Sequence, residues 1–178
     1  MRDALLSTVA LALLATAGDF VWARWLPRHT VVAGVAHGAL LFLAAGAMLG
    51  RPHRRPGAGA GWGLGAGVAG AVVFYALAPL IGMAAMFVAW FVLWIVLGAA
   101  TFGILQPERR ALEGVVRGVV AGLSSGLAFY AVSGMWRNWN PAAISYPDHL
   151  WRWTIAFLPA FLCLKLLPRP NPSRHTDC

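Results

Sequence analysis

Two ionisable side chains, Asp19 and His37, lie inside long apolar segments of the sequence. Asp19 precedes Trp25 by six residues and His37 follows Val31 by six. At a helical rise of 1.5 Å per residue, each lies roughly 9 Å inside its segment. Both segments reach the same connection, so the two side chains are expected at a similar depth, facing each other. An ionisable group in such a place is costly, which makes each residue a functional candidate.

The chemistry open to an Asp–His pair is a proton relay, contact with a polar ligand group or a share in a metal site. A purely structural hydrogen bond between the first two helices is the competing interpretation, at about 1–2 kcal/mol in a membrane. Arg24 and His29 lie in the connection beside the pair and are added to the candidate ligand-binding residues.

A second cluster lies in the stretch from residue 135 to residue 153, predicted to be a long loop. Its candidate ligand-binding residues are Trp136, Arg137, Asn138, Trp139, Asn140, Asp148, His149 and Arg152. Tryptophans in such numbers are typical of the interface between lipid and water. Polar groups mixed among flat apolar rings are also typical of clefts for small organic molecules. A loop of about 15 residues is more often functional than a short connection.

Composition indicates the setting of these clusters. The chain has 178 residues, of which 60% are hydrophobic and 11% charged. A soluble domain carries roughly 25% charged residues, so a lipid-facing surface is expected. The net charge of +8 does not predict nucleic-acid binding, because the arginines lie mainly at the ends of apolar runs. Two cysteines give neither a disulfide framework nor a metal-ligand spacing.

The apolar runs predict an all-α integral membrane protein with about six transmembrane helices in one domain, residues 1–178. The expected spans are 4–22, 31–49, 62–78, 83–104, 112–135 and 151–167. Residues 62–106 carry no charge and are too long for one crossing, so a turn is expected at Ala78–Gly82, around Pro79. Residues 1–17 have some features of a cleaved signal peptide, although a retained first helix is favoured.

Charge predicts the orientation. An even number of spans puts both termini on one side, with Arg2, Arg51, Arg54, Arg55, Arg109, Arg110, Arg117, Lys165, Arg169 and Arg174. The other side has only Arg24, Arg28, Arg137 and Arg152. Because cytoplasmic loops are enriched in basic residues, both termini are expected in the cytoplasm, with the protein in the inner membrane. The Asp19–His37 pair and the tryptophan-rich loop then both lie on the outer side.

Small residues recur four apart within the spans. The ridges are Gly59–Gly63–Gly67–Ala71, Gly118–Gly122–Gly126 and Gly34–Gly38. Such ridges let helices approach closely in lipid, and packing within the chain is favoured over an oligomer or partner interface. A faint repeat also relates residues 66–76 to residues 121–131 at an offset of 55, and the same offset from Phe74 reaches Asp19. It suggests three two-helix hairpins.

Two smaller signals concern the predicted cytoplasmic side. Glu113 and Arg117 are four residues apart at a helix start, which favours an i,i+4 ion pair. Lys165, the only lysine, is placed to extend to the membrane interface.

Three functions are compatible with these patterns. The favoured hypothesis is a protein that binds or transports a small molecule from the outer side. The alternatives are a non-catalytic accessory subunit of a membrane complex, and a membrane enzyme using Asp19/His37 or Asp148/His149. Six spans in so short a chain are similar in outline to the substrate-binding subunits of vitamin uptake transporters, by size and span count alone. The expected partners are the lipid bilayer, a small-molecule ligand and other membrane subunits or a second copy of the chain, and nucleic acid is not expected; the cofactor is left unassigned.

Overall fold

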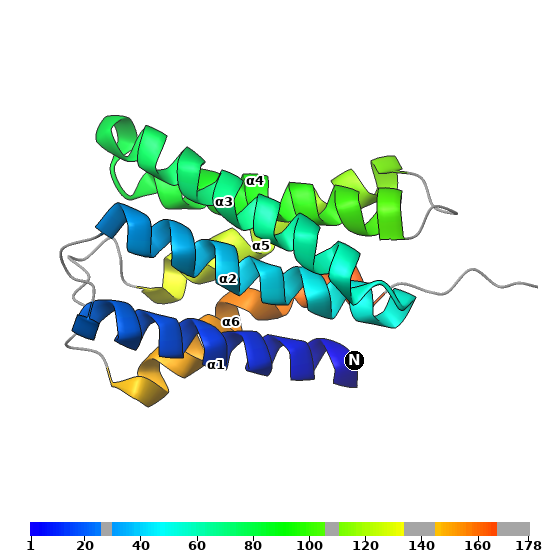
Figure 1. Cartoon of the computed structure of the whole chain (residues 1–178), viewed down its shortest axis with the longest axis horizontal. Helices are drawn as coiled ribbons and strands as arrows, with labels where there is room; N and C mark the ends of the chain where they lie inside the picture. Colours follow the sequence, from blue (N-terminus) through cyan, green and yellow to red (C-terminus); the bar gives the residue numbers. More distant parts are fainter. Residues whose placement is uncertain (26–29, 106–110, 134–144, 167–178) are drawn as a thin grey trace, which may run out of the picture.

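A computed structural model describes residues 1–25, 30–105, 111–133 and 145–166 (Figure 1). Its elements are α1 (Arg2–Trp25), α2 (Thr30–Gly50), the 3₁₀ turn η1 (Arg51–His53), α3 (Pro56–Ile81), α4 (Ala84–Ala100), the π-helical turn η2 (Thr101–Leu105), α5 (Ala111–Ser133) and α6 (Tyr146–Lys165). The described residues are therefore helical and include no strand. Five of the helices, α1 to α5, are long and apolar enough to cross a membrane.

The six helices run up and down and form a closed circle. Each packs against its neighbours in chain order, and α1 packs against α6 to complete it. The bundle has two distinct ends. We name the end with Asp19, Gly82 and the start of α6 the cavity end. The end with Asp3, η1 and Lys165 is the basic end.

Helix α6 differs from the other five. It carries Asp148, Arg152 and Lys165, and it is not among the five helices that are long and apolar enough to cross a membrane. One face is nevertheless fully buried, and its rings also contact α2 and α4. The side chains on this face are Ala156, Phe157, Ala160 and Phe161.

The prediction of a loop from residue 135 to residue 153 is wrong for its last part, because residues 146–153 are helical. Helix α6 starts at Tyr146 because Ser145 caps it: the Ser145 hydroxyl accepts a hydrogen bond from the Asp148 amide, and a proline occupies the first turn. Asp148, His149 and Arg152 therefore belong to a helix. The rest of that loop, like His29, lies outside the described residues.

Helix α3 is longer than predicted at both ends. It starts at Pro56, six residues before Trp62, because a proline suits the first helical position. At the other end Pro79 lies inside the last turn, and the helix continues to Ile81. The chain reverses at Gly82, whose φ of 59° is in the region that favours glycine. The turn is thus where it was expected, but Gly82 makes it.

Glycines hold α2 against α3 and α4 against α5 in backbone contact. A Cβ on Gly59 or Gly63 would meet the α2 backbone at Gly46 or Phe42. A Cβ on Gly118 would likewise lie 2.6 Å from the carbonyl oxygen of Trp94. The predicted ridges therefore pack within the chain. They join each predicted hairpin to the next, through α2 with α3 and α4 with α5.

The contacts of these glycines change towards the cavity end. A Cβ on Gly122 would meet both the ring and the backbone of Phe91, at 2.9 and 3.1 Å, and a Cβ on Gly126 would meet the side chains of Phe87 and Trp90. A side chain between two helices holds their axes farther apart than backbone contact does. The bundle is accordingly tightest at the basic end and gains room at the cavity end.

Ion pairs close the basic end. Lys165 Nζ donates to Asp3 Oδ2 at 2.7 Å and to the Ser7 hydroxyl at 2.6 Å, joining α6 to α1. The predicted Glu113–Arg117 pair is present at 3.0 Å. The Lys165 side chain is 7% exposed and lies against α1, and its extension to the membrane interface stays a prediction.

Candidate functional site

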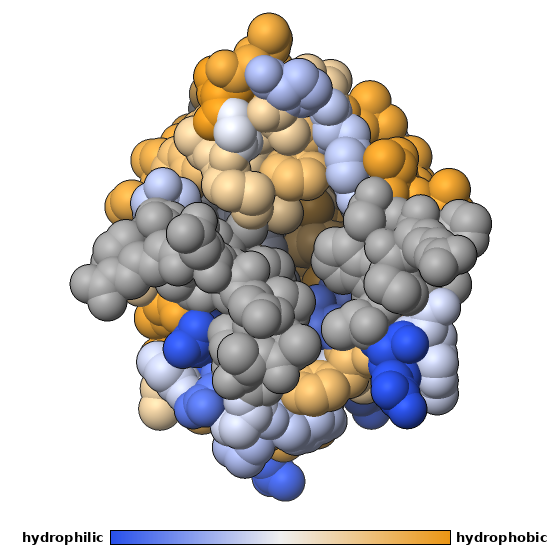
Figure 2. Space-filling model, turned by 90° about the vertical axis from the view of Figure 1, so that its left-hand side faces the viewer, coloured by the Kyte–Doolittle hydropathy of each residue, from blue (hydrophilic) through white to orange (hydrophobic). Residues whose placement is uncertain are grey.

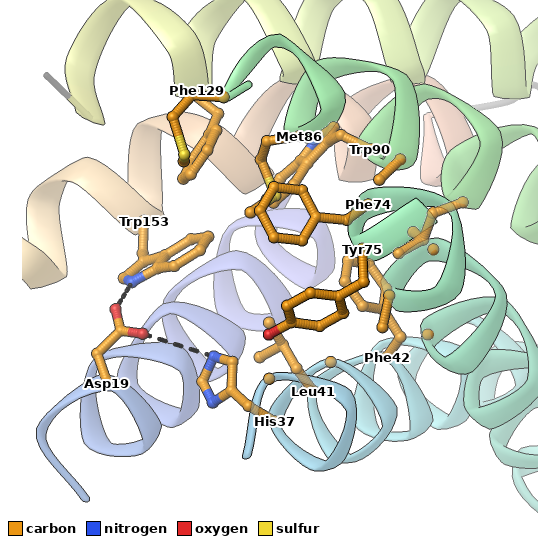
Figure 3. Close-up of a pocket in the computed structure, with 18 residues that line it drawn as sticks. Asp19, His37, Leu41, Phe42, Phe74, Tyr75, Met86, Trp90, Phe129 and Trp153 are labelled. Carbon is orange, nitrogen blue, oxygen red and sulfur yellow. Dashed lines mark hydrogen bonds and ion pairs between the residues drawn. The ribbon is translucent and has the colours of Figure 1, made fainter. Parts of the chain in front are cut away.

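A cavity of about 370 Å³ lies among the helices in the half of the bundle nearer the cavity end (Figure 3). Its lining comes from all six helices. The lining residues are Asp19, Gly34, His37, Gly38, Leu41, Phe42, Gly67, Gly70, Ala71, Phe74, Tyr75, Met83, Met86, Ala89, Trp90, Leu93, Phe129 and Trp153. Viewed from this end, the surface shows a hollow with apolar atoms on its inner wall (Figure 2).

Asp19 is the polar centre of this cavity. Its side chain is 5% exposed, although it is a carboxylate. Trp153 Nε1 donates to Asp19 Oδ2 at 2.7 Å, and His149 Nδ1 lies 3.3 Å from the same oxygen. Phe20 packs edge-on against the His149 ring at 5.3 Å and covers it. One carboxylate oxygen is thus held by two groups of α6.

His37 faces the other oxygen of the same carboxylate. His37 Nε2 lies 3.7 Å from Asp19 Oδ1, which is beyond hydrogen-bond distance (Figure 3). Within the described part of the chain, this buried nitrogen makes no hydrogen bond. The imidazole lies directly on the backbone of Gly18, where a Cβ would collide with it. Gly18 therefore permits the approach of α2 to α1 at this point.

Stacked aromatic rings form one wall of the cavity. Trp90 stacks on Phe129 at 4.7 Å, and Trp153 stacks on Phe129 at 5.1 Å and on Phe157 at 5.2 Å. The hydroxyl of Ser125 accepts from Trp90 Nε1 at 2.8 Å and donates to the Ala156 carbonyl. Both indole nitrogens are therefore hydrogen-bonded, and the rings have fixed orientations.

Helix α3 supplies the opposite aromatic wall. Figure 3 shows the rings of Phe74 and Tyr75 directed into the cavity. The Tyr75 hydroxyl lies against Gly34, one turn before His37 on α2. The polar atoms thus gather at one end, by Asp19, His37 and Tyr75, and the lining towards Leu41 and Leu93 is apolar.

The predicted offset of 55 residues relates three residues of this lining. Asp19, Phe74 and Phe129 lie on α1, α3 and α5, which run in the same direction, and all three line the cavity. The positions that follow them are Phe20, Tyr75 and Tyr130, each aromatic. At these three equivalent positions α3 and α5 have a phenylalanine, whereas α1 has an aspartate.

The sequence-predicted residues separate into three groups. Asp19 and His37 line the cavity, and His149 reaches Asp19 from behind. Arg24, Asp148 and Arg152 lie at the same end but are not among the residues that line the cavity. His29, Trp136, Arg137, Asn138, Trp139 and Asn140 lie outside the described residues.

Asp148 and His149 do not form a pair, although they are adjacent in sequence. Asp148 is exposed and accepts from the Ser145 hydroxyl at 2.7 Å and from Trp151 Nε1 at 3.4 Å. His149 points the other way and is 3% exposed. The proposed acid–base use of the two together therefore has no geometric basis.

Sequence reasoning missed most of the cavity wall. Trp153 belongs to the tryptophan-rich stretch whose pattern is typical of the lipid–water interface, and no sequence pattern indicates a role for Phe42 or Trp90. Two signals could have found them. The sequence Ser145-Tyr-Pro-Asp148 is a helix start, from which His149 and Trp153 lie one turn apart on one face. The offset of 55 residues marked Phe74 and Phe129 with Asp19.

The arrangement offers a charged acceptor and flat apolar surfaces. Among the described residues, no three His, Cys, Asp or Glu side chains are grouped in a way that could hold a metal ion. The site can bind a molecule with an apolar body and a polar or charged group. Comparisons with protein families, curated proteins and solved structures find no match for this chain.

Proposed function

We propose that this chain is an integral membrane protein of the inner membrane with six spans and both termini in the cytoplasm. Five apolar helices of sufficient length support this proposal, and α6 is counted as the sixth span. Exposed leucines, valines and tryptophans on the outer faces of the helices suit contact with lipid. The basic end has six basic residues in the described part: Arg2, Arg51, Arg54, Arg55, Arg117 and Lys165. The cavity end has Arg24 and Arg152, so the cavity end is assigned to the outer side.

Cysteine labelling in intact cells tests this orientation. In a background with Cys163→Ala and Cys178→Ser, one new cysteine is placed at Arg54 and another at Met83, which lie at opposite ends. A membrane-impermeant maleimide is expected to label M83C in intact cells, and R54C only after lysis. The reverse pattern would invert the orientation, and equal labelling of both in intact cells would contradict a membrane-spanning bundle.

We further propose that the protein binds a small, largely apolar molecule in the cavity from the outer side. One observation carries this: a 370 Å³ space, lined by aromatic rings and glycines, has its polar atoms gathered at one end. A mostly apolar space of this size with a few polar groups is typical of sites that bind small organic molecules. Transport of this molecule is the wider form of the proposal.

Filling the cavity with a side chain tests the binding function. Ala71 lines the cavity, and Gly61 on the same helix has open space beside it. Both are changed to Trp, so the added side chain is the same and only its direction differs. The proteins are purified in mild detergent and their masses are measured by native mass spectrometry. A small molecule retained by the wild type and by G61W, but lost from A71W, is the expected result. Equal retention by all three, or by none, would contradict binding in this cavity.

The accessory-subunit hypothesis stays an alternative. The predicted glycine ridges pack against neighbouring helices of the chain, whereas Gly57, Gly61 and Gly65, four residues apart on α3, have open space beside them.

A further inference from the structure

The buried charge of Asp19 restricts the chemistry of the ligand, and an inference about that ligand rests on the proposed binding function. Burying a charge is costly unless another charge compensates it. Within the described residues, the basic groups within 4 Å of this carboxylate are two imidazoles, those of His37 and His149. Neither is a permanent cation. The basic end, by contrast, uses a lysine and an arginine for its ion pairs.

The two carboxylate oxygens are used unequally. Oδ2 accepts from Trp153, and His149 stands beside it, both from the α6 side. Oδ1 has only the His37 nitrogen nearby, at 3.7 Å, among the described residues. Because Asp19 also lines the cavity, Oδ1 is the oxygen with capacity left for a ligand.

The remaining lining suits the apolar part of a ligand. Trp90, Trp153 and Phe129 line the cavity. Trp153 joins both features, since its nitrogen holds Asp19 and its ring belongs to the wall.

We propose that the ligand is an organic cation, whose positive centre lies by Asp19 Oδ1 and whose apolar part lies among the aromatic rings. A neutral molecule of the same shape leaves the buried carboxylate uncompensated. An anion is repelled by it. An organic cation compensates the charge of the Asp19 carboxylate, and its apolar part fills the apolar part of the cavity.

Two molecules of the same shape separate charge from size. Benzyltrimethylammonium is a permanent cation, and neopentylbenzene is its neutral counterpart with carbon in place of nitrogen. Each is titrated calorimetrically into the full chain in nanodiscs of zwitterionic phosphatidylcholine, with empty nanodiscs subtracted. The cation is expected to bind wild type at least 10-fold more tightly than the neutral molecule. Equal or tighter binding of neopentylbenzene, or no binding of the cation, would overturn the inference.

Variants of Asp19 test whether its charge causes the preference for the cation. Asp19→Asn keeps an acceptor for Trp153 and removes the charge, so it is expected to weaken cation binding at least 10-fold and to change neopentylbenzene binding less than threefold. Asp19→Glu keeps the charge and is expected to retain the cation preference. If D19N binds the cation as wild type does, the inference is wrong. The native mass spectra of A71W and G61W remain a separate test, because a retained neutral molecule would support the proposed function and contradict the cation.

Discussion

The two ends of the bundle join α1 to α6 in opposite ways. At the basic end Asp3 is 63% exposed and pairs with Lys165 at 2.7 Å. At the cavity end Asp19 is 5% exposed and is held by an indole and an imidazole. The first aspartate has its countercharge within the chain, and the second has no permanent one among the described residues. The same residue type thus closes one end and leaves the other ready for a charged ligand.

The packing of the helices also differs between the two ends of the bundle. Near the basic end, Gly46 and Gly59 bring α2 and α3 into backbone contact, and Gly98 and Gly114 do so for α4 and α5. Near the cavity end, aromatic side chains stand between the helices. A cavity in a small bundle can therefore be made by the choice of residues along the helices, with no change in their connections.

The largest effect is expected where the backbones touch. In Gly63→Val the new side chain would meet the Phe42 carbonyl, and we expect a loss of about 3 kcal/mol in the free energy of unfolding. The measurement is reversible unfolding in mixed detergent micelles. Gly61→Val is the control on the same helix, with open space beside it and an expected change of about 0.5 kcal/mol or less. Similar losses in the two variants would mean that the α2–α3 contact is less tight than described.

Removing one donor to Asp19 is the next test. Trp153→Phe keeps an aromatic ring and deletes the 2.7 Å hydrogen bond, so a loss of about 2 kcal/mol is expected. Trp151→Phe deletes a hydrogen bond to the exposed Asp148 and is expected to cost little. In D19N the penalty of W153F should shrink, because a neutral amide is less costly to leave unpaired than a carboxylate. If W153F costs as much unfolding free energy in D19N as in wild type, the charge of Asp19 does not cause the loss.

A smaller effect is expected at the serine behind the aromatic wall. Ser125→Ala removes the acceptor of Trp90 and the donor to the Ala156 carbonyl, at a cost of about 1.5 kcal/mol. The neighbouring Ser124 is a matched control, since its hydroxyl bonds only to its own helix. Ser124→Ala should leave unfolding within about 0.5 kcal/mol of wild type. Equal effects would show that Ser125 does not anchor the wall.

The smallest effect is expected from the ion pair at the basic end. Lys165→Met removes the pair but keeps a long apolar side chain, and Asp3 remains solvated, so the loss should be about 1 kcal/mol or less. Cation binding should be unchanged in this variant. A loss of ligand affinity as large as that in D19N would erase the functional distinction between the two aspartates.

Much of the fold was predictable because apolar length and charge position are local properties. The helix bounds were close except at α3 and α6, where Pro56 and Ser145 start helices earlier than hydropathy indicates. The closed circle of helices was not predictable, since neither the α1–α6 contact nor the buried face of α6 follows from hydropathy.

The candidate site was predictable only in part. Depth along two adjacent helices was enough to put Asp19 beside His37, and the structure has them 3.7 Å apart. Depth could not show that α1 packs mainly on α6, which brings His149 and Trp153 to the same carboxylate. The part of the predicted site in residues 136–140 lies outside the described residues, and its ligand-binding role stays a prediction.

The stacked wall also has optical properties. Trp90 and Trp153 are nearly parallel, with their ring centres 5.9 Å apart. The absorption and fluorescence of an indole ring depend on the polarity of its surroundings. Because both indoles line the cavity, a molecule entering it changes their surroundings directly. The protein therefore carries its own optical reporter of occupancy, and binding can be followed without any attached label.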